Sequence, residues 1–212
     1  MRLRNRMSHA TARARERGSA LIEFLLCMAL LIVPLLLGTT VLGLNLVREI
    51  QVTEVCRDAT HMYSQGVDFT ETSYQTELFK IAQGLNITAN GGNGVIILST
   101  ITYIDSNACA AGGVSNSNCT NLGKNVFTRQ VVIGNSALQA SAYGTPPVDS
   151  SNSDNVSETN YLTNSAAQAQ NFTLISLSAG QYAYVGETYF QTPDLSWWGP
   201  LGTTHISARF VF

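Results

Sequence analysis

The feature that most constrains this chain is an apolar run from Ala20 to Val47, in which Glu23 is the only charged residue. A helix rises about 1.5 Å per residue, so this run would span about 42 Å, more than the ~30 Å hydrocarbon core of a bilayer. The run therefore predicts a transmembrane helix over residues 19–47. Pro34 predicts a kink within it.

Charge is distributed unevenly on the two sides of this run. Residues 1–18 carry six arginines and one glutamate, a net charge of +5, whereas the rest of the chain carries −7. Because the basic flank of a membrane helix stays in the cytoplasm, we expect a single-pass protein whose N-terminus is cytoplasmic and whose chain after residue 48 lies across the membrane. The arginines are explained as a topology signal, so no nucleic-acid partner is expected.

The residues at the start of the run resemble a known processing signal. An ordinary secretory signal is cleaved after its apolar region, but here the small residue Gly18 precedes it. The stretch Gly18-Ser19-Ala20-Leu21-Ile22-Glu23-Phe24 resembles the leader junction of type IV pilins and pseudopilins, and Arg-Gly-Ser-Ala-Leu-Ile-Glu-Phe is most similar to the TadE/TadG-like pseudopilins of the tight-adherence pilus system. Three later stretches are more loosely similar to that family: Phe127–Asn135, Tyr182–Phe190 and Ala208–Phe212.

This resemblance implies a maturation pathway and a set of partners. A prepilin peptidase would remove the leader, residues 1–18, by cutting after Gly18, and Ser19 would become the first mature residue. The apolar segment would remain as an anchor in the bacterial inner membrane, surrounded by membrane lipid. Glu23 and Phe24 would take part in packing against other pilin or pseudopilin subunits and the pilus assembly machinery.

Helical spacing continues beyond the membrane segment, over residues 48–84. Apolar residues at three- and four-residue steps extend the first helix to about Ser64, with Gly66 as its C-terminal stop. A second, shorter helix is predicted from Glu71 to Gln83 and ends at Gly84; Asp68 or Thr70 is its expected N-cap.

The remaining residues, 85–212, read as a β-rich domain. The segment Asn86–Gly94 is predicted to be a turn-rich connection, and the polar stretch Asn135–Gln170 a long loop. The expected strands are Val95–Ile104, Asn125–Ile133, Phe172–Leu177, Gln181–Phe190 and His205–Phe212, of which the first two form a hairpin. The fold class is α+β: a long N-terminal transmembrane helix continues into a periplasmic stalk and packs against a small antiparallel sheet. The pilin resemblance implies the same architecture.

Four cysteines are present, and only Cys109 and Cys119 are close in sequence. Cys27 lies inside the membrane segment and Cys56 at its outer edge. A zinc site would need a second ligand pair nearby, and none exists, so no metal site is predicted. In an oxidising periplasm a Cys109–Cys119 disulfide is the favoured interpretation. Two unpaired thiols on a flexible loop are the alternative.

The chain offers little for catalysis. It contains no Gly-x-Ser-x-Gly elbow, His-Glu-x-x-His helix or Walker loop, and no two histidines stand at ligand spacing. A catalytic role for His205 would need Asp194 or Glu187 beside it in the fold, an arrangement that the sequence leaves open. We therefore expect a protein that is not an enzyme and needs no cofactor.

Two further features have both a functional and an ordinary interpretation. Hard oxygen ligands around a calcium ion would come from Asp149, Asn152, Asp154, Asn155 and Glu158, but their spacing misses the EF-hand pattern. The pair Trp197-Trp198 would form an exposed adhesive patch or, more commonly, cover one end of a sheet core.

Two functions remain after these exclusions. The first is a pseudopilin-like structural subunit or assembly factor of a tight-adherence pilus or secretion apparatus. The alternative is a membrane-tethered periplasmic binding or adhesion domain that does not enter a filament. An anchored hydrolase is a third class, for which the sequence lacks residues.

Overall fold

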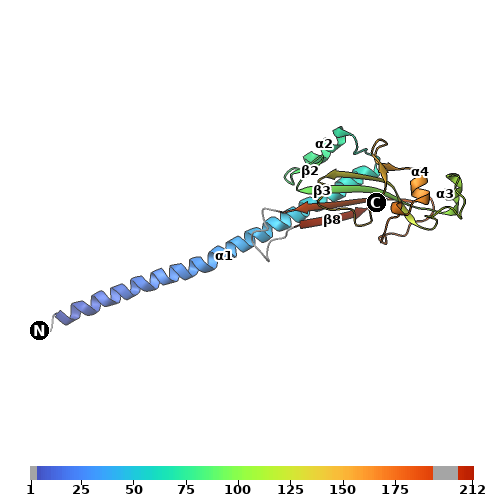
Figure 1. Ribbon diagram of the computed structural model, residues 1–212. Coiled ribbons are helices and arrows are strands. Elements are labelled where there is room, and N and C mark those ends of the chain that lie inside the picture. The colour runs from blue at the N-terminus through green and yellow to red at the C-terminus, as the bar shows by residue number, and fades with distance from the viewer. Residues whose placement is uncertain (1–3, 193–204) are drawn as a thin grey trace.

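A long helix and a small sheet dominate the computed structural model, which describes residues 4–192 and 205–212, with side chains from Ala20 onward. Helix α1 (Arg4–Ser64) runs unbroken through Pro34 and projects from the domain (Figure 1). The membrane segment and the stalk expected from the sequence are therefore one continuous element. Proline inside a helix removes one backbone hydrogen bond, a loss that membrane helices tolerate.

The end of α1 is fixed by backbone geometry, as the sequence predicts. The Val67 N–H donates to the Met62 carbonyl at 3.1 Å, and the Gly66 N–H donates to the Tyr63 carbonyl at 3.0 Å. These two bonds form a Schellman motif, which needs a left-handed residue, and Gly66 has a φ of +88°. The glycine thus satisfies the last carbonyls of α1 and ends the helix after Ser64.

Helix α2 (Thr72–Ile81) is shorter than predicted, and its start differs. Glu71 is the N-cap residue but makes no side-chain capping bond. Asp68, one of the two predicted caps, instead accepts hydrogen bonds from the backbone N–H and hydroxyl of Thr70 at 3.0 and 2.8 Å, so it shapes the turn before the helix. Leu78 is fully buried and holds α2 on the domain.

A six-stranded antiparallel sheet forms the centre of the domain, in the spatial order β5-β6-β4-β3-β7-β8. Its strands are β3 (Gly94–Tyr103), β4 (Asn125–Gly134), β5 (Val148–Asp149), β6 (Asn155–Val156), β7 (Tyr182–Gln191) and β8 (His205–Val211). The predicted β3–β4 hairpin is confirmed, with Ile97 opposite Val132. The connection before β3 contains a small separate hairpin, β1 (Ile87–Thr88) with β2 (Gly91–Gly92).

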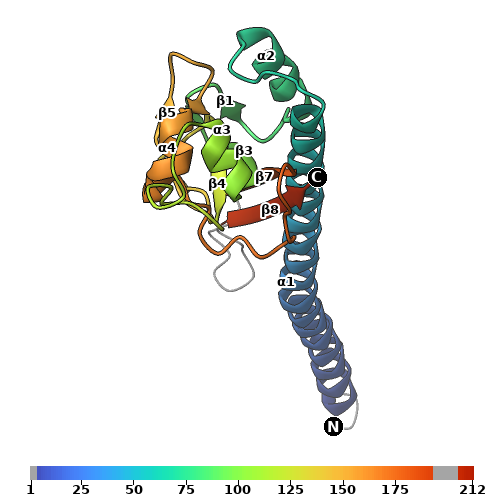
Figure 2. The same ribbon diagram turned by 90° about the vertical axis from the view of Figure 1, so that its right-hand side faces the viewer.

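One face of the sheet packs against the outer half of α1, on the β7–β8 side (Figure 2). Val52, Val55 and Ala59 of α1 lie in a common core with Ile96 and Leu98 of β3. All five side chains are at most 2% exposed, so water is excluded from this contact. The predicted α+β arrangement, with a long apolar helix and a small antiparallel sheet, is confirmed in these terms.

The opposite face is covered by the stretch that was predicted to be a long polar loop, and that prediction is wrong. Residues 135–170 contain β5, β6, helix α4 (Glu158–Thr163) and the 3-10 turn η1 (Ser165–Ala167). Tyr143, Val156 and Ala167 from this stretch pack with Ile101 and Phe127 in a second core. A few well-spaced apolar residues are enough to order it, because each finds a hydrophobic surface on the sheet.

The strand predicted over Phe172–Leu177 is also absent from the described structure. Phe172 is buried and packs edge-to-face on Tyr143, with 5.3 Å between ring centroids, whereas Leu174 and Ile175 are exposed. Phe172 is instead part of the second core, so packing against the sheet overrides the β-forming composition of this stretch.

Candidate functional site

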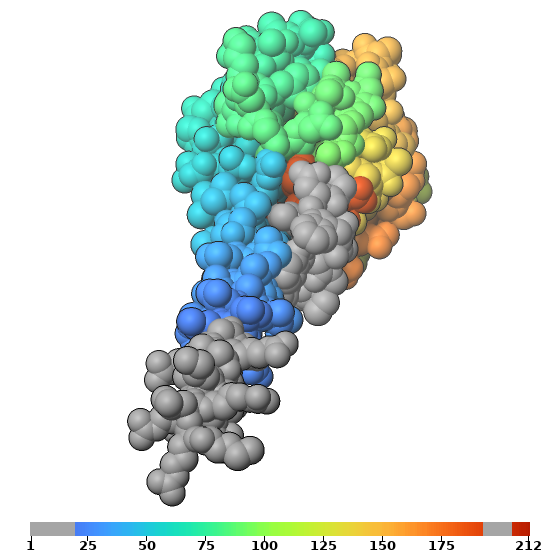
Figure 3. All heavy atoms as spheres, turned by 90° about the vertical axis from the view of Figure 1, so that its left-hand side faces the viewer, coloured from blue at the N-terminus to red at the C-terminus, as the bar shows by residue number. Residues whose placement is uncertain are grey.

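The first candidate site is the exposed apolar length of α1. Every side chain from Ala20 to Leu37 is exposed in the isolated chain, and in the space-filling view this segment, in blue, lies at the surface (Figure 3). Among the described residues, α1 is the one helix that is long enough and apolar enough to cross a membrane. An apolar surface of this extent is unfavourable in water, which supports membrane anchoring.

The predicted processing and packing residues lie at the beginning of this segment. Gly18 and Ser19 fall within the backbone span of α1, just before Ala20, from which side chains are described. Glu23 and Phe24 follow on the same helix, and both side chains are exposed. The Glu23 carboxylate and the Phe24 ring therefore lie on an exposed helix surface. Cleavage after Gly18 stays a prediction.

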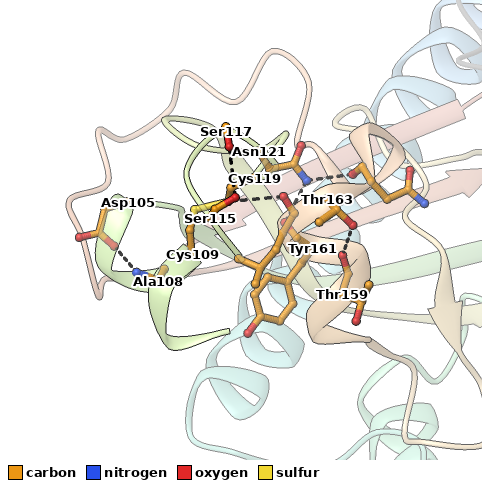
Figure 4. Close-up of a disulfide and its surroundings, with 12 residues drawn as sticks. Asp105, Ala108, Cys109, Ser115, Ser117, Cys119, Asn121, Thr159, Tyr161 and Thr163 are labelled. Atoms are coloured by element: carbon orange, nitrogen blue, oxygen red, sulfur yellow. Dashed lines mark hydrogen bonds between the residues drawn. A yellow bond between two sulfur atoms is a disulfide. The ribbon is translucent and has the colours of Figure 1, made fainter. Parts of the chain in front are cut away.

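The second candidate site is the disulfide between Cys109 and Cys119, which confirms the sequence prediction (Figure 4). Its Cα atoms are 6.1 Å apart, and both cysteines are buried. Cys109 belongs to helix α3 (Ser106–Ala111), which the sequence did not predict. Asp105 caps α3 by accepting a hydrogen bond from the Ala108 N–H at 2.8 Å.

The disulfide belongs to a small polar and apolar cluster that joins α3 to α4. The Asn121 side-chain amide donates to the carbonyls of Tyr161 and Asn164, each at 2.9 Å, and its oxygen accepts from Gln168 at 2.8 Å. Leu162 of α4 lies in one hydrophobic cluster with both cysteines. This module lies at the end of the domain farthest from the N-terminus (Figure 1).

The other two cysteines are separate from the disulfide. Cys27 is exposed on the apolar segment, and Cys56 is buried between α1 and the sheet. The Cys56 thiol lies 3.4 Å from the carbonyl oxygens of Gly186 and Ala208, and its one S–H can donate to either of them. Burial raises the pKa of Cys56 above its ordinary value, so this thiol is a packing residue and not a reactive one.

An ion pair that the sequence analysis missed joins the α1–α2 turn to β4. Arg129 contacts the Asp68 carboxylate, donates to the Ser153 carbonyl at 2.8 Å and lies 5.8 Å from the centroid of the Tyr63 ring. Burial acts to raise the pKa of Asp68, but hydrogen bonds from Thr70 and the pairing with Arg129 outweigh it and lower that pKa. Burial raises the pKa of Tyr63 to about 12.

A cleft of about 400 Å³ lies beside β7 and β8, on the face of the sheet opposite α1. Glu187 and Arg209 face each other in its wall at 3.0 Å, and the Glu187 carboxylate also accepts from the Ser141 hydroxyl and the Ala142 N–H. The Arg209 guanidinium stacks 4.8 Å from the centroid of the Tyr143 ring. Glu187 therefore serves to hold residues 141–142 on the sheet.

His205 also lines this cleft, and its surroundings show whether Glu187 lies beside it as a catalytic role would require. His205 stacks on Tyr189 with 5.4 Å between ring centroids, and it pairs across the sheet with Gln191. Glu187 pairs instead with Arg209. The structure thus does not give His205 the Glu187 partner that catalysis would need. Asp194 and Trp197-Trp198 lie outside the described residues.

The proposed calcium ligands are not assembled into one site. Asp149 accepts from the Ser151 N–H and hydroxyl at 3.0 and 2.6 Å, which closes a turn. The Asn155 amide donates to the Asn152 carbonyl, and Glu158 lies instead beside Gly112 at the disulfide module. Within the described part of the chain, no group of three His, Cys, Asp or Glu residues is placed to hold a metal ion.

Comparison with known proteins identifies no relative. No protein-family model, curated protein or solved structure matches this chain. Functional assignment therefore rests on the sequence signals and the geometry described above.

The residues that the sequence analysis missed share one property: their partners are distant along the chain. Asp68 and Arg129 are 61 positions apart, and Ser141 and Glu187 are 46 apart. Their separations follow no helix or strand period, and short-range spacing carries no signal for such pairs. Cys109 and Cys119 were found because they are close in sequence.

Proposed function

We propose that this protein is a membrane-anchored, non-catalytic, pseudopilin-like subunit or assembly factor of a tight-adherence pilus or secretion apparatus in the bacterial inner membrane. A prepilin peptidase would cut after Gly18 on the cytoplasmic side, and the domain would lie in the periplasm. Its partners would be other pilin or pseudopilin subunits and the assembly machinery.

The observation that carries the proposal is the continuity of α1 through three sequence regions. One helix joins the basic leader, the exposed apolar segment and the face of the sheet. This architecture suits a subunit that keeps its anchor after losing its leader, because a cut after Gly18 removes only the beginning of α1 and leaves the apolar segment joined to the part of the helix that packs on the sheet. An ordinary secretory signal would be lost with its apolar region.

A second candidate function is a tethered periplasmic binding or adhesion domain. The cleft beside Glu187 and Arg209 favours it, because pockets of about 300–1,000 Å³ are the usual size for small ligands. The walls of this cleft are already engaged in internal hydrogen bonds, however, and the binding alternative gives no reason for the Gly18 junction or for Glu23 in the apolar run.

Intact-mass spectrometry of the purified protein tests the proposal. We expect a mature N-terminus at Ser19 in cells that contain a prepilin peptidase and the full-length mass in cells without it. A chain that keeps residues 1–18 in the presence of the peptidase would reject processing and favour the tethered binding domain.

A further inference from the structure

We propose that Asn90, in the turn of the small β1–β2 hairpin, is a site of spontaneous covalent modification at which the side-chain amide is lost and aspartate or isoaspartate forms. This site is independent of the proposed function. The sequence contains two Asn-Gly dipeptides, Asn90-Gly91 and Asn93-Gly94. The fold exposes the first and restrains the second.

An Asn-Gly dipeptide holds a nucleophile next to an electrophile. The glycine nitrogen, after losing its proton to hydroxide, attacks Cγ of the asparagine, a C–N bond forms, and the side-chain nitrogen leaves as ammonia. Water then opens the resulting five-membered succinimide at either of its carbonyls, which gives aspartate or isoaspartate. The attack is intramolecular, and the missing Cβ of glycine leaves the nitrogen unhindered.

The first dipeptide lies in a hairpin that can open by itself. Thr88 pairs with Gly91, so Ala89 and Asn90 are the two residues of the turn. Asn90 is exposed, and no hydrogen bond to another described residue holds its side chain. The hairpin is a separate sheet with two residues in each strand, and two-stranded hairpins are marginally stable in water. Opening of the Thr88–Gly91 pair therefore gives the Asn90 side chain access to the Gly91 nitrogen.

The contacts that hold this hairpin lie mainly at its base. Ile87 is buried in the core between the sheet and α1, and the Asn93 N–H donates to the Asn86 carbonyl at 2.9 Å. The turn itself is tied to β4 through the Gly134 N–H, which donates to the Ala89 carbonyl at 3.1 Å. The tip can thus open while the base stays in place.

The second dipeptide is part of the central sheet. The Asn93 carbonyl accepts from the Gln191 N–H at 2.8 Å, and the Gly94 carbonyl accepts from the Asn135 N–H at 3.0 Å. Gly94 is buried and begins β3, which lies between β4 and β7. A succinimide requires the peptide between Asn93 and Gly94 to turn, and these bonds fix it on both sides. Core strands open at a much higher free energy than peripheral turns, so this dipeptide is protected.

Mass spectrometry of the full chain in detergent tests the site. The protein is incubated at mildly alkaline pH and digested with pepsin in acid, and electron-transfer fragmentation locates aspartate and isoaspartate. We expect Asn90 to convert at least about tenfold faster than Asn93, a ratio equivalent to about 1.4 kcal/mol. In a parallel sample unfolded in urea the two should convert at comparable rates, because both are then unrestrained Asn-Gly dipeptides.

Gly91→Ala is the matched variant. Its added Cβ would lie 3.4 Å from Thr88 Oγ1, an ordinary contact, and Gly91 does not have a positive φ. The hairpin should therefore keep its shape, while conversion of Asn90 falls several-fold and Asn93 behaves as in the parent.

Three results would overturn the proposal. Equal conversion of Asn90 and Asn93 in the folded protein would show that the hairpin does not open separately from the sheet. Conversion of Asn90 in urea but not in the folded protein would show that the turn is protected. Conversion of Asn90 in Gly91→Ala as fast as in the parent would exclude attack by the unhindered glycine nitrogen.

Discussion

A Cβ atom added at Gly186 of β7 would lie 1.7 Å from Oγ1 of Thr60 on α1. Thr60 is fully buried, and its hydroxyl donates to the Cys56 carbonyl at 2.6 Å. The Cys56 thiol in turn lies against the Gly186 carbonyl. Helix and sheet therefore approach so closely at this point that only glycine fits opposite Thr60.

Gly186→Ala is expected to destabilise the domain by about 1–3 kcal/mol, because overpacking forces the α1–β7 contact apart. Urea unfolding of the detergent-solubilised protein measures the effect. Gly91→Ala is the matched control, since its added Cβ would lie 3.4 Å from Thr88 Oγ1, an ordinary contact. Thr60→Ala should partly restore the stability of the Gly186→Ala variant, and equal stability of both glycine variants would contradict this packing account.

Replacing both Cys109 and Cys119 by serine is expected to lower the free energy of unfolding by about 2–3 kcal/mol, because the bridge closes a short loop and so restrains the unfolded chain. Cys27→Ser, on the exposed segment, should leave the domain unchanged. Alkylation of the native protein without reductant gives an independent check. Free reaction of Cys109 and Cys119 would show that the bridge does not form.

The Asp68–Arg129 pair is expected to make stability depend on pH. Because the pKa of Asp68 is lowered in the folded protein, its contribution is fully present above the ordinary value of 3.8 and is lost as the pH falls through the lowered pKa. Asp68→Asn should cost on the order of 1 kcal/mol at neutral pH, discounted for partial exposure, and the difference from the parent should shrink as the pH falls below 3.8 and through the lowered pKa of Asp68.

Thermal melting from pH 2 to 7 checks this dependence. The matched control is Asp58→Asn, because Asp58 pairs with Arg57 at 3.1 Å on the exposed side of α1. Exposed pairs contribute little, so this variant should follow the parent closely. An Asp68→Asn variant whose melting temperature differs from the parent by the same amount at every pH would exclude the ion pair as the cause.

Gly18→Val is expected to block removal of the leader, because a peptidase cutting beside a membrane segment leaves little room for a side chain at that position. Intact mass should then remain that of the full chain. Ala12→Val, within the leader and away from the junction, is the control and should mature normally. Complete removal of the leader from the Gly18→Val variant would show that a side chain at position 18 does not block cleavage.

Glu23→Gln is expected to leave cleavage and insertion normal but to impair incorporation into the pilus machinery. After cleavage the Ser19 α-amine, with an ordinary pKa near 8, is mostly cationic at neutral pH, and it can pair with Glu23 of a neighbouring subunit. Co-purification with pilin partners measures the effect. Assembly of the Gln variant equal to that of the parent would leave Glu23 as an acid that simply reaches the headgroups.

Much of the architecture was readable from local patterns. The apolar run, the helical spacing after it and Gly66 placed the end of α1 correctly at Ser64, because helix stops depend on neighbouring residues. The predicted ends of strands β3, β4, β7 and β8 each lie within one residue of the observed ends. The disulfide was predicted because its cysteines are close and lack other ligands.

Tertiary structure decided what local patterns do not encode. The stretch 135–170 is polar in composition, yet Tyr143, Val156 and Leu162 order it because the sheet offers them apolar surface. Residues 172–177 have strand composition but find no strand neighbour. The sequence by itself determined the long apolar helix, the position of its end and the main strands, since these follow from spacing and chain geometry. Only the fold brought Asp68 to Arg129 and Thr60 to Gly186, because those contacts join segments that are distant along the chain.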